Sequence, residues 1–207
     1  MATPKIACVP NGPYLLENAR LRRASGETWP AGKGVALCRC GGSQKKPFCD
    51  GTHGRNGFRD DNRADPAKDK RKAYAGKGIT IFDNRALCAH AGHCTEQLPS
   101  VFRQEARPWI DPDGASVRDI VALIDKCPSG ALSYVLPGVE AAPPQGPSMV
   151  TIADNGPYQI TGGIELVDVK QGDGASGERY TLCRCGASNN KPFCDGSHWA
   201  AGFRDPI

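Results

Sequence analysis

The sequence predicts a small, β-rich α+β protein in which two copies of one unit flank a different unit. Motifs within residues 11–60 recur about 145 residues later, and the segment between the copies has a pattern of its own. Of the 207 residues, 39% are hydrophobic and 7% aromatic, so units of this size are marginal on burial alone. We expect domains at 1–62, 63–140 and 141–207.

The repeat is strongest around its cysteines. Of the seventeen positions in Leu37–His53 and Leu182–His198, thirteen are identical. The turn motif Asn-Gly-Pro-Tyr precedes this region in both copies, from Asn11 and from Asn155, and Gly-Phe-Arg-Asp follows it. Segments such as Gly163–Lys170 alternate as short strands do. Each copy is therefore predicted to be a small antiparallel sheet that leads into a loop.

Each copy carries three cysteines and one histidine at the same intervals. The spacing Cys-x-Cys-x8-Cys-x3-His occurs at Cys38, Cys40, Cys49 and His53, and again at Cys183, Cys185, Cys194 and His198. Thiolates and imidazoles are the ligands of zinc and of iron–sulfur clusters. The spacing therefore predicts two metal or cluster sites of the same kind. Bound centres would then contribute to the folding free energy of these small units.

The spacing also indicates how the ligands are presented. In an extended segment, residues i and i+2 point the same way, so Cys38 and Cys40 lie on one side while the arginine between them points away. Asp50 is a candidate helix N-cap, and a helix from there would place Cys49 and His53 one turn apart on one face. The free N–H groups of such a helix terminus would favour an anionic centre.

Two other uses of these residues fit the spacing less well. A structural zinc ion also accepts three cysteines and a histidine, but its ligands usually begin with Cys-x2-Cys rather than Cys-x-Cys. A disulfide between Cys38 and Cys40 would be strained and would leave the histidine without a part. We therefore favour clusters, with structural zinc as an alternative.

The segment Cys38–His53 resembles the signature of the CDGSH iron–sulfur (NEET) family. Cys194–His198 reads Cys-Asp-Gly-Ser-His, the residues that name the family, whereas the first copy has Thr52 in place of the serine. The resemblance covers about half of the chain and implies a 2Fe–2S cluster in each copy. The implied ligands are Cys38 and Cys40 for the inner iron and Cys49 and His53 for the outer iron, with Cys183, Cys185, Cys194 and His198 in the same roles in the second copy.

A single histidine ligand has two consequences. Neutral imidazole in place of a thiolate removes one negative charge, so the reduction potential should lie between those of four-cysteine and two-histidine centres. Imidazole also titrates near neutral pH. Reduction can then couple to proton uptake on His53 or His198, or acid can loosen the outer iron and make the cluster transferable.

The segment between the copies holds a third group of cysteines. Cys88 and Cys94 take the outer positions of a Cys-x2-Cys-x2-Cys run in which Ala91 replaces the middle thiolate, and Cys127, followed by proline, supplies the distant ligand. Three thiolates and an alanine at the fourth corner predict a 3Fe–4S cluster. A 4Fe–4S cluster is the alternative if a histidine, water or a small molecule completes it.

His90 and His93 are the candidates for that extra ligand. Neither stands at the expected position, and we interpret both as ordinary loop residues that bond to backbone. Trp109 is interpreted as a packing anchor. Cys8 belongs to no group and is expected to be a lone thiol.

The middle segment resembles the divergent single-cluster ferredoxins, some of which carry electrons to monooxygenases. The resemblance rests on Cys127–Leu132, which follows a helical pattern at Ser116–Lys126, and on Leu98–Phe102 after the cysteine pair. It covers about a third of the chain. A strand is also predicted at Gly78–Phe82.

Two segments read as linkers. Asp60–Lys72 is charged and poor in large apolar residues, and 141–148 contains three prolines. The basic stretch Lys68–Lys72 is interpreted as solvated linker rather than as a docking site.

Composition and pattern exclude several classes. The net charge of +4 is too modest for a nucleic-acid binder, and neither a signal peptide nor a membrane span is recognisable. No nucleophile–base pair or nucleotide loop is evident, so we do not expect an enzyme. We expect a cytoplasmic monomer whose two copies pair within the chain. Its partners would be redox proteins, either a reductase or an acceptor, or apo proteins that accept a cluster.

Overall fold

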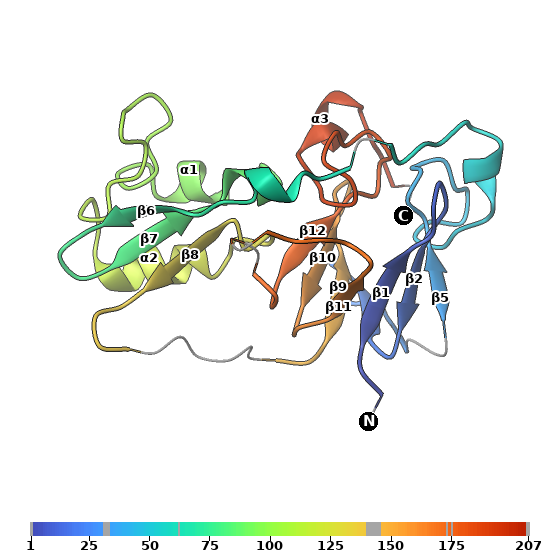
Figure 1. Cartoon of the computed structure of the whole chain (residues 1–207), viewed down its shortest axis with the longest axis horizontal. Coiled ribbons are helices and arrows are strands. Elements are labelled where there is room, and N and C mark those ends of the chain that lie inside the picture. Colours follow the sequence, from blue (N-terminus) through green and yellow to red (C-terminus); the bar gives the residue numbers. More distant parts are fainter. Residues whose placement is uncertain are drawn as a thin grey trace.

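The computed structural model describes residues 2–30, 34–61, 63–139, 146–172, 174 and 176–205. Along its longest axis, the paired copies lie at one end and the intervening unit at the other (Figure 1). We call these units repeat 1, the middle domain and repeat 2, in chain order. Short strands dominate the described residues and the helices are few, so the predicted β-rich α+β class is confirmed.

Two mixed sheets form the paired repeats. Their strand orders are β11-β1-β2-β5 and β12-β10-β9-β3-β4. The strands of repeat 1 are β1 (Lys5–Cys8), β2 (Tyr14–Glu17), β3 (Arg20–Arg23), β4 (Thr28–Pro30) and β5 (Val35–Leu37). Those of repeat 2 are β9 (Met149–Ile152), β10 (Tyr158–Thr161), β11 (Glu165–Val167) and β12 (Tyr180–Leu182).

The repeats exchange strands, which the sequence did not predict. β11 of repeat 2 joins β1 of repeat 1 with Leu166 opposite Ile6, and β3 of repeat 1 joins β9 of repeat 2 with Leu21 opposite Val150. Both pairings are parallel, so the prediction of one antiparallel sheet per repeat is wrong. Strands of three or four residues cannot cover their own apolar face, and sharing strands gives both repeats one larger core.

That core is built by residues at alternating strand positions. In β2, Leu16 is fully buried while its neighbour Leu15 is 37% exposed, as the side-chain alternation of a half-buried strand requires. Ile160 of β10 belongs to the same apolar cluster, and so do Leu87 and Ala131 of the middle domain. The middle domain is therefore packed against the paired repeats and not merely tethered to them.

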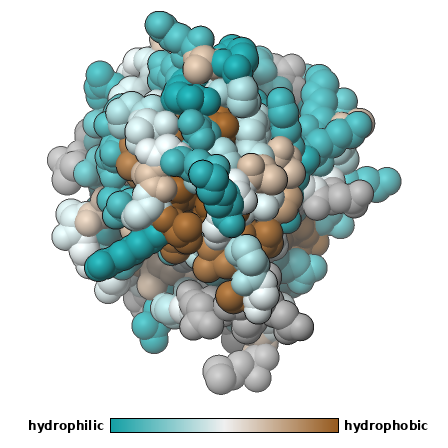
Figure 2. All heavy atoms as spheres, turned by 90° about the vertical axis from the view of Figure 1, so that its left-hand side faces the viewer, coloured by the Kyte–Doolittle hydropathy of each residue, from teal (hydrophilic) through white to brown (hydrophobic). Residues whose placement is uncertain are grey.

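The middle domain is a three-stranded antiparallel sheet with two helices. Its elements are β6 (Lys72–Ala75), β7 (Thr80–Asp83), β8 (Leu132–Val135), α1 (His93–Gln97) and α2 (Val117–Ile124). The sheet order is β6-β7-β8, and its second apolar core includes Ile81 and Ile120. Ser116 caps α2 by accepting a hydrogen bond from the N–H of Asp119, as the predicted helix from Ser116 implied. Figure 2 shows a mainly hydrophilic surface at this end of the molecule, with apolar patches near its centre.

The first predicted linker is more structured than expected. Asp60 is buried and paired with Arg39 at 3.0 Å, and residues Pro66–Lys68 form a 3₁₀ helix. Asp69 is buried and accepts a hydrogen bond from Asn84. The prediction of a linker was based on the charge of this segment. It was wrong because these carboxylates are buried and bonded to buried partners. In the second predicted linker, 141–145 lie outside the described residues.

None of the ten cysteines forms a disulfide in the structure. Among the described residues, no helix is long and apolar enough to span a membrane.

Candidate metal centres

The four donors of each repeat form two pairs at chelating distance. Cys38 Sγ lies 3.9 Å from Cys40 Sγ, and Cys49 Sγ lies 3.4 Å from His53 Nδ1. Two thiolates on one tetrahedral metal are about 3.8 Å apart, and a thiolate and an imidazole nitrogen about 3.5 Å. In the described part of the chain, no three Cys, His, Asp or Glu side chains surround a single ion position. Each pair is spaced to chelate one metal ion.

Repeat 2 has the same geometry. Cys183 Sγ and Cys185 Sγ are 3.7 Å apart, and Cys194 Sγ is 3.5 Å from His198 Nδ1. The prediction that Cys-x-Cys points both sulfurs one way is confirmed at both copies. The hydrogen bond from Cys183 lowers the pKa of Cys185 to about 7.

The helices at these sites start later than predicted. Residues Thr52–Gly54 form a 3₁₀ helix that begins after Gly51, and α3 (Ser197–Ala200) begins after Gly196. Both glycines have φ above 80°, the left-handed region that glycine enters at no steric cost. Cys49 therefore precedes its helix, and a turn brings it to His53.

Asp50 organises that turn without being the N-cap residue. Its carboxylate accepts hydrogen bonds from the N–H groups of Thr52 at 3.0 Å and Gln44 at 2.8 Å. The hydrogen bonds from Thr52, followed by that from Gln44, hold the pKa of Asp50 well below its usual value. Asp195 makes the same two bonds in repeat 2, so this Asp joins the two arms of each ligand loop.

The arginine between the two cysteines has a structural role, which the spacing of the cysteines did not predict. Arg184 is fully buried and pairs with Asp205 at 2.7 Å. Its guanidinium lies over the rings of Tyr158 at 5.5 Å and Phe203 at 5.1 Å. Arg39 has the equivalent partners Asp60, Tyr14 and Phe58 in repeat 1. The repeated Gly-Phe-Arg-Asp motif thus supplies the ring and carboxylate that hold the Cys-x-Cys segment.

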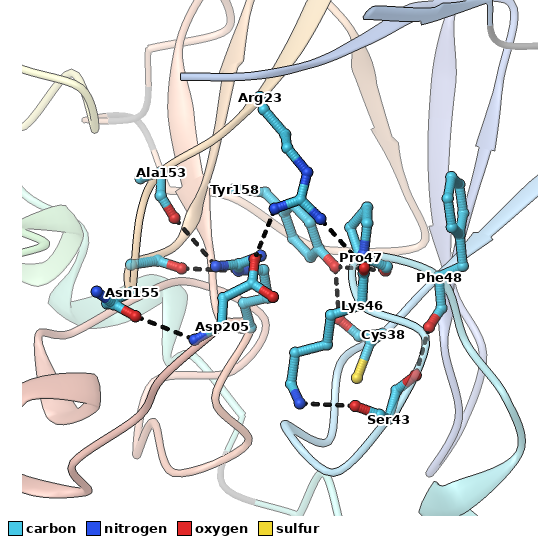
Figure 3. A network of polar contacts seen from close by, with 12 residues as sticks. Arg23, Cys38, Ser43, Lys46, Pro47, Phe48, Ala153, Asn155, Tyr158 and Asp205 are labelled. Carbon is cyan, nitrogen blue, oxygen red and sulfur yellow. Dashed lines mark hydrogen bonds and ion pairs between the residues drawn. The ribbon is translucent and has the colours of Figure 1, made fainter. Parts of the chain in front are cut away.

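A tyrosine from each repeat holds the ligand loop of the other. The hydroxyl of Tyr158 donates to the carbonyls of Cys38 at 2.9 Å and Pro47 at 3.0 Å, both in repeat 1 (Figure 3). Tyr14 makes the same bonds to Cys183 and Pro192 in repeat 2. The strand exchange makes this crossing possible. Recurrence of Asn-Gly-Pro-Tyr in both copies was the available signal for these residues.

Each loop is also closed from within. In repeat 1 the Ser43 hydroxyl donates to the carbonyl of Phe48 at 2.6 Å, and Lys46 Nζ donates to the carbonyl of Ser43 at 2.6 Å (Figure 3). Ser188 and Lys191 repeat both contacts in repeat 2.

The two ligand loops meet at the pseudo-two-fold axis. A Cβ placed on Gly41 would lie 2.4 Å from the carbonyl oxygen of Cys185, and one on Gly186 would lie 2.8 Å from that of Cys40. Any side chain at either glycine would collide with backbone. The sites of repeat 1 and repeat 2 are therefore in direct backbone contact through their Cys-x-Cys segments.

The three cysteines of the middle domain line one cavity. Cys88, Cys94 and Cys127 face a space of about 680 Å³, and Ala91 lines it as well. Burial raises the pKa of Cys88 and of Cys94, and the neighbouring thiols raise both further. The structure thus assembles the predicted thiol set around a cavity that also includes the alanine at the fourth corner.

Arg85 and Trp109 form one wall of this cavity. The Arg85 guanidinium lies 4.3 Å from the centre of the Trp109 ring, and its Nη1 donates to Cys88 Sγ at 3.6 Å. Trp109 packs against the middle-domain core and donates to buried Asp83 at 3.2 Å, which agrees with its interpretation as a packing anchor. Arg85 was not singled out from sequence, and no spacing rule would have found it.

The histidines of the middle loop differ in their contacts. His93 Nδ1 lies 3.4 Å from the side-chain amide of Gln97. His90 has a φ of 53° and packs against repeat 2, where a Cβ on Gly196 would lie 3.0 Å from its own Cβ. His90 therefore connects the loop of the middle site to the ligand loop of repeat 2, a contact that its interpretation as an ordinary loop residue missed.

Among the described residues, the ligand loop of repeat 2 contacts the middle domain and that of repeat 1 does not. The Asn190 amide donates to the carbonyl of Ala86 at 2.7 Å, and Arg179 donates to the carbonyl of Cys127 at 3.4 Å. Cys194 is 3% and His198 5% exposed, whereas their counterparts in repeat 1 are only half-buried. Burial raises the pKa of Cys194 to about 12 and lowers that of His198.

Comparison with known proteins agrees with this division of the chain. A family model described as iron-binding zinc finger, CDGSH type, matches residues 11–54 and 155–199, and one described as divergent 4Fe–4S mono-cluster matches 74–137. The uncharacterized protein YjdI of Escherichia coli K12, and that of strain O157:H7, are 41% identical over 63 residues, which are 30% of this chain and 83% of each relative. No solved structure matches the chain.

The donor chemistry fits the families that match. Thiol and imidazole pairs stand at chelating distance in both repeats, and three thiols share one cavity in the middle domain. The chain therefore belongs to the CDGSH family of iron-binding proteins and is an iron–sulfur protein in which two CDGSH units flank a divergent 4Fe–4S mono-cluster domain.

Proposed function

We propose that the protein is a one-electron carrier with a 2Fe–2S site in each repeat and a 3Fe–4S site in the middle domain. The repeat ligands would be Cys38, Cys40, Cys49 and His53, and Cys183, Cys185, Cys194 and His198; the middle ligands would be Cys88, Cys94 and Cys127. When bound, iron–sulfur clusters take up and release single electrons. Ala91 at the open corner supports three irons in the middle site, and a 4Fe–4S centre with an additional ligand is the alternative.

The order of contacts carries this proposal. The middle loop touches the repeat 2 loop through His90 and Gly196, and the repeat 2 loop touches the repeat 1 loop through Gly186 and Cys40. In Figure 1 the ligand loop that ends in α3 lies between the middle domain and the loop of repeat 1. Three sites in contact in a line form a relay: middle domain, repeat 2, repeat 1.

The chain's own groups prepare these sites for electron transfer. Backbone N–H groups of Gly42, Gly51 and Ala187 donate to ligand sulfurs at 3.4–3.5 Å. Such bonds stabilise negative charge on sulfur and tune the reduction potential. The buried tyrosine and arginine contacts fix the loops, so little reorganisation is needed when the charge changes.

Cluster donation or redox sensing is the second candidate. The half-buried His53 favours it, because a neutral nitrogen ligand near solvent is the one most readily lost. Transfer of a cluster to an apo acceptor, faster than reduction by any reductase, would favour this function over the relay. Partners would then be apo proteins instead of a reductase or an acceptor.

The proposal also includes the cellular compartment, the oligomeric state and the partners of the protein. Ten cysteines, none of them in a disulfide, support the reducing cytoplasm, and strand exchange within one chain supports a monomer. We propose no enzymatic activity, no nucleic-acid or membrane partner, and no further subunit.

Iron and sulfide analysis with electron paramagnetic resonance on anaerobically purified protein tests the proposal. We expect seven irons per chain, following the three- and two-iron assignments, and a 3Fe–4S signal before reduction. Eight irons and a silent oxidised sample would make the middle site 4Fe–4S. Zinc in place of iron would overturn the function.

A further inference from the structure

The ligand loops of the two repeats form equivalent surfaces, and in the part of the chain that the structure describes the middle domain covers the one in repeat 2. In repeat 2, the ligand loop lies against the middle domain through the contacts of Gly196 with His90 and of Asn190 with Ala86. In repeat 1, the equivalent loop is at the far side of the molecule from the middle domain (Figure 1). His53 is half-buried, whereas His198 is 5% exposed.

The domain that covers the ligand loop of repeat 2 indicates what kind of partner the equivalent loop of repeat 1 can bind. Its occupant is a small domain whose three thiols line a cavity next to the contact, which brings two redox sites together. A partner that docks on the open copy in the same way would bring its own redox centre next to the repeat 1 site. The open copy is therefore suited to a small redox protein.

The charge of the open copy differs from that of the covered one. Lys45 and Arg55 are exposed in repeat 1, where repeat 2 has Asn190 and Ala200 at the equivalent positions. Arg55 donates to the Thr52 hydroxyl at 3.3 Å, next to His53. Neither Lys45 nor Arg55 forms an ion pair with another described residue, so both charges are available to a partner.

We propose that this surface of repeat 1, formed by Lys45, Thr52, His53 and Arg55, is the docking site for an acidic one-electron carrier. This inference rests on the proposed relay. It assigns repeat 1, the last site of that relay, as the place where the external carrier docks. The covered copy is bound permanently and needs no charge, whereas the open copy must find its partner by diffusion. Basic groups around an exposed ligand raise the association rate with an acidic protein and add little permanent affinity.

The test measures electron transfer from a reduced, strongly acidic plant-type 2Fe–2S ferredoxin to the fully loaded protein by stopped-flow absorbance. The double variant Lys45→Asn/Arg55→Ala gives repeat 1 the residues that repeat 2 already carries in the same loop. We expect its second-order rate constant to fall about three- to tenfold at low ionic strength. The dependence of the rate on salt should also flatten.

The matched control removes the same two charges from the middle domain. Lys77→Asn/Arg118→Ala changes exposed residues at the other end of the molecule and should leave the rate within about twofold of the wild type. An equal loss in both variants, or no loss in the first, would overturn the docking site. A wild-type protein that holds its clusters but accepts no electron would instead overturn the relay.

Discussion

The residues that decide the geometry of each site include several that bind no metal. Tyr14 belongs to repeat 1 but holds the carbonyl of Cys183 in repeat 2, and Tyr158 does the reverse. Both hydroxyls are fully buried, and burial raises the pKa of each well above its ordinary value, so they remain hydrogen-bond donors. A substitution of the tyrosine in one repeat should therefore weaken the metal site of the other repeat.

Replacing Tyr14 by phenylalanine tests this crossing. The change leaves a buried carbonyl of Cys183 without its donor, at a cost of about 1–3 kcal/mol. Cluster loss should accelerate at the repeat 2 site and not at the repeat 1 site, and Tyr158→Phe should give the opposite pattern. Resonance spectra of the two variants during chelation assign the site. Faster loss at the variant's own repeat would contradict the crossed contacts.

Trp199 accounts for part of the difference between the two histidine ligands. It is 64% exposed, and its ring lies 5.0 Å from that of His198, whereas repeat 1 has Gly54 at the equivalent position. We expect Trp199→Gly to increase several-fold the rate at which repeat 2 loses iron to a chelator, because water then reaches His198. Gly54→Trp is the reciprocal variant and should slow the loss from repeat 1. If neither variant changes its rate of iron loss, the middle domain alone accounts for the difference between the two histidine ligands.

At the scale of elements, local chemistry was predictable and pairing between distant segments was not. The Cys-x-Cys arrangement and the helix capped by Ser116 follow from residue direction and capping, which depend on a few neighbouring residues. The start of α3 was misplaced because the left-handed Gly196, and not the Asp before it, stands at the N-cap. The parallel pairing of β3 with β9 joins segments far apart in sequence, and three- or four-residue strands carry too little pattern to specify it.

Ala91, in the loop from Cys88 to Cys94, allows the number of irons in the middle site to be tested. Ala91 lines the same cavity as the three thiols and stands where a fourth ligand belongs. Ala91→Cys should raise the iron content by one per chain and remove the signal seen before reduction. Ala91→Ser is the size-matched control and should leave both measurements as in the wild type. A cysteine variant with unchanged iron content would mean that another ligand already completes the middle site.

At the scale of the molecule, the inserted domain makes two equal sites unequal. The internal repeat predicted two sites with the same ligands, and this shared ligand pattern does not distinguish a covered copy from an open one. The difference arises because Ala86 and His90 of the middle domain contact repeat 2 alone among the described parts of the two ligand loops. The docking of the units depends on side-chain complementarity that no periodic pattern records.

Strand exchange also predicts that the two repeats unfold as one unit. Leu21 is in repeat 1 by sequence, is 1% exposed, and lies opposite Val150 in the sheet that carries most of repeat 2. Leu21→Ala should cost about 2–5 kcal/mol and should speed amide hydrogen exchange equally in β2 and β10, followed by mass spectrometry. Ile120→Ala removes an equally buried side chain from the separate core of the middle domain, and should speed exchange in β7 and α2 first. Faster exchange in repeat 1 alone after Leu21→Ala would mean that the exchanged strands do not couple the two sites.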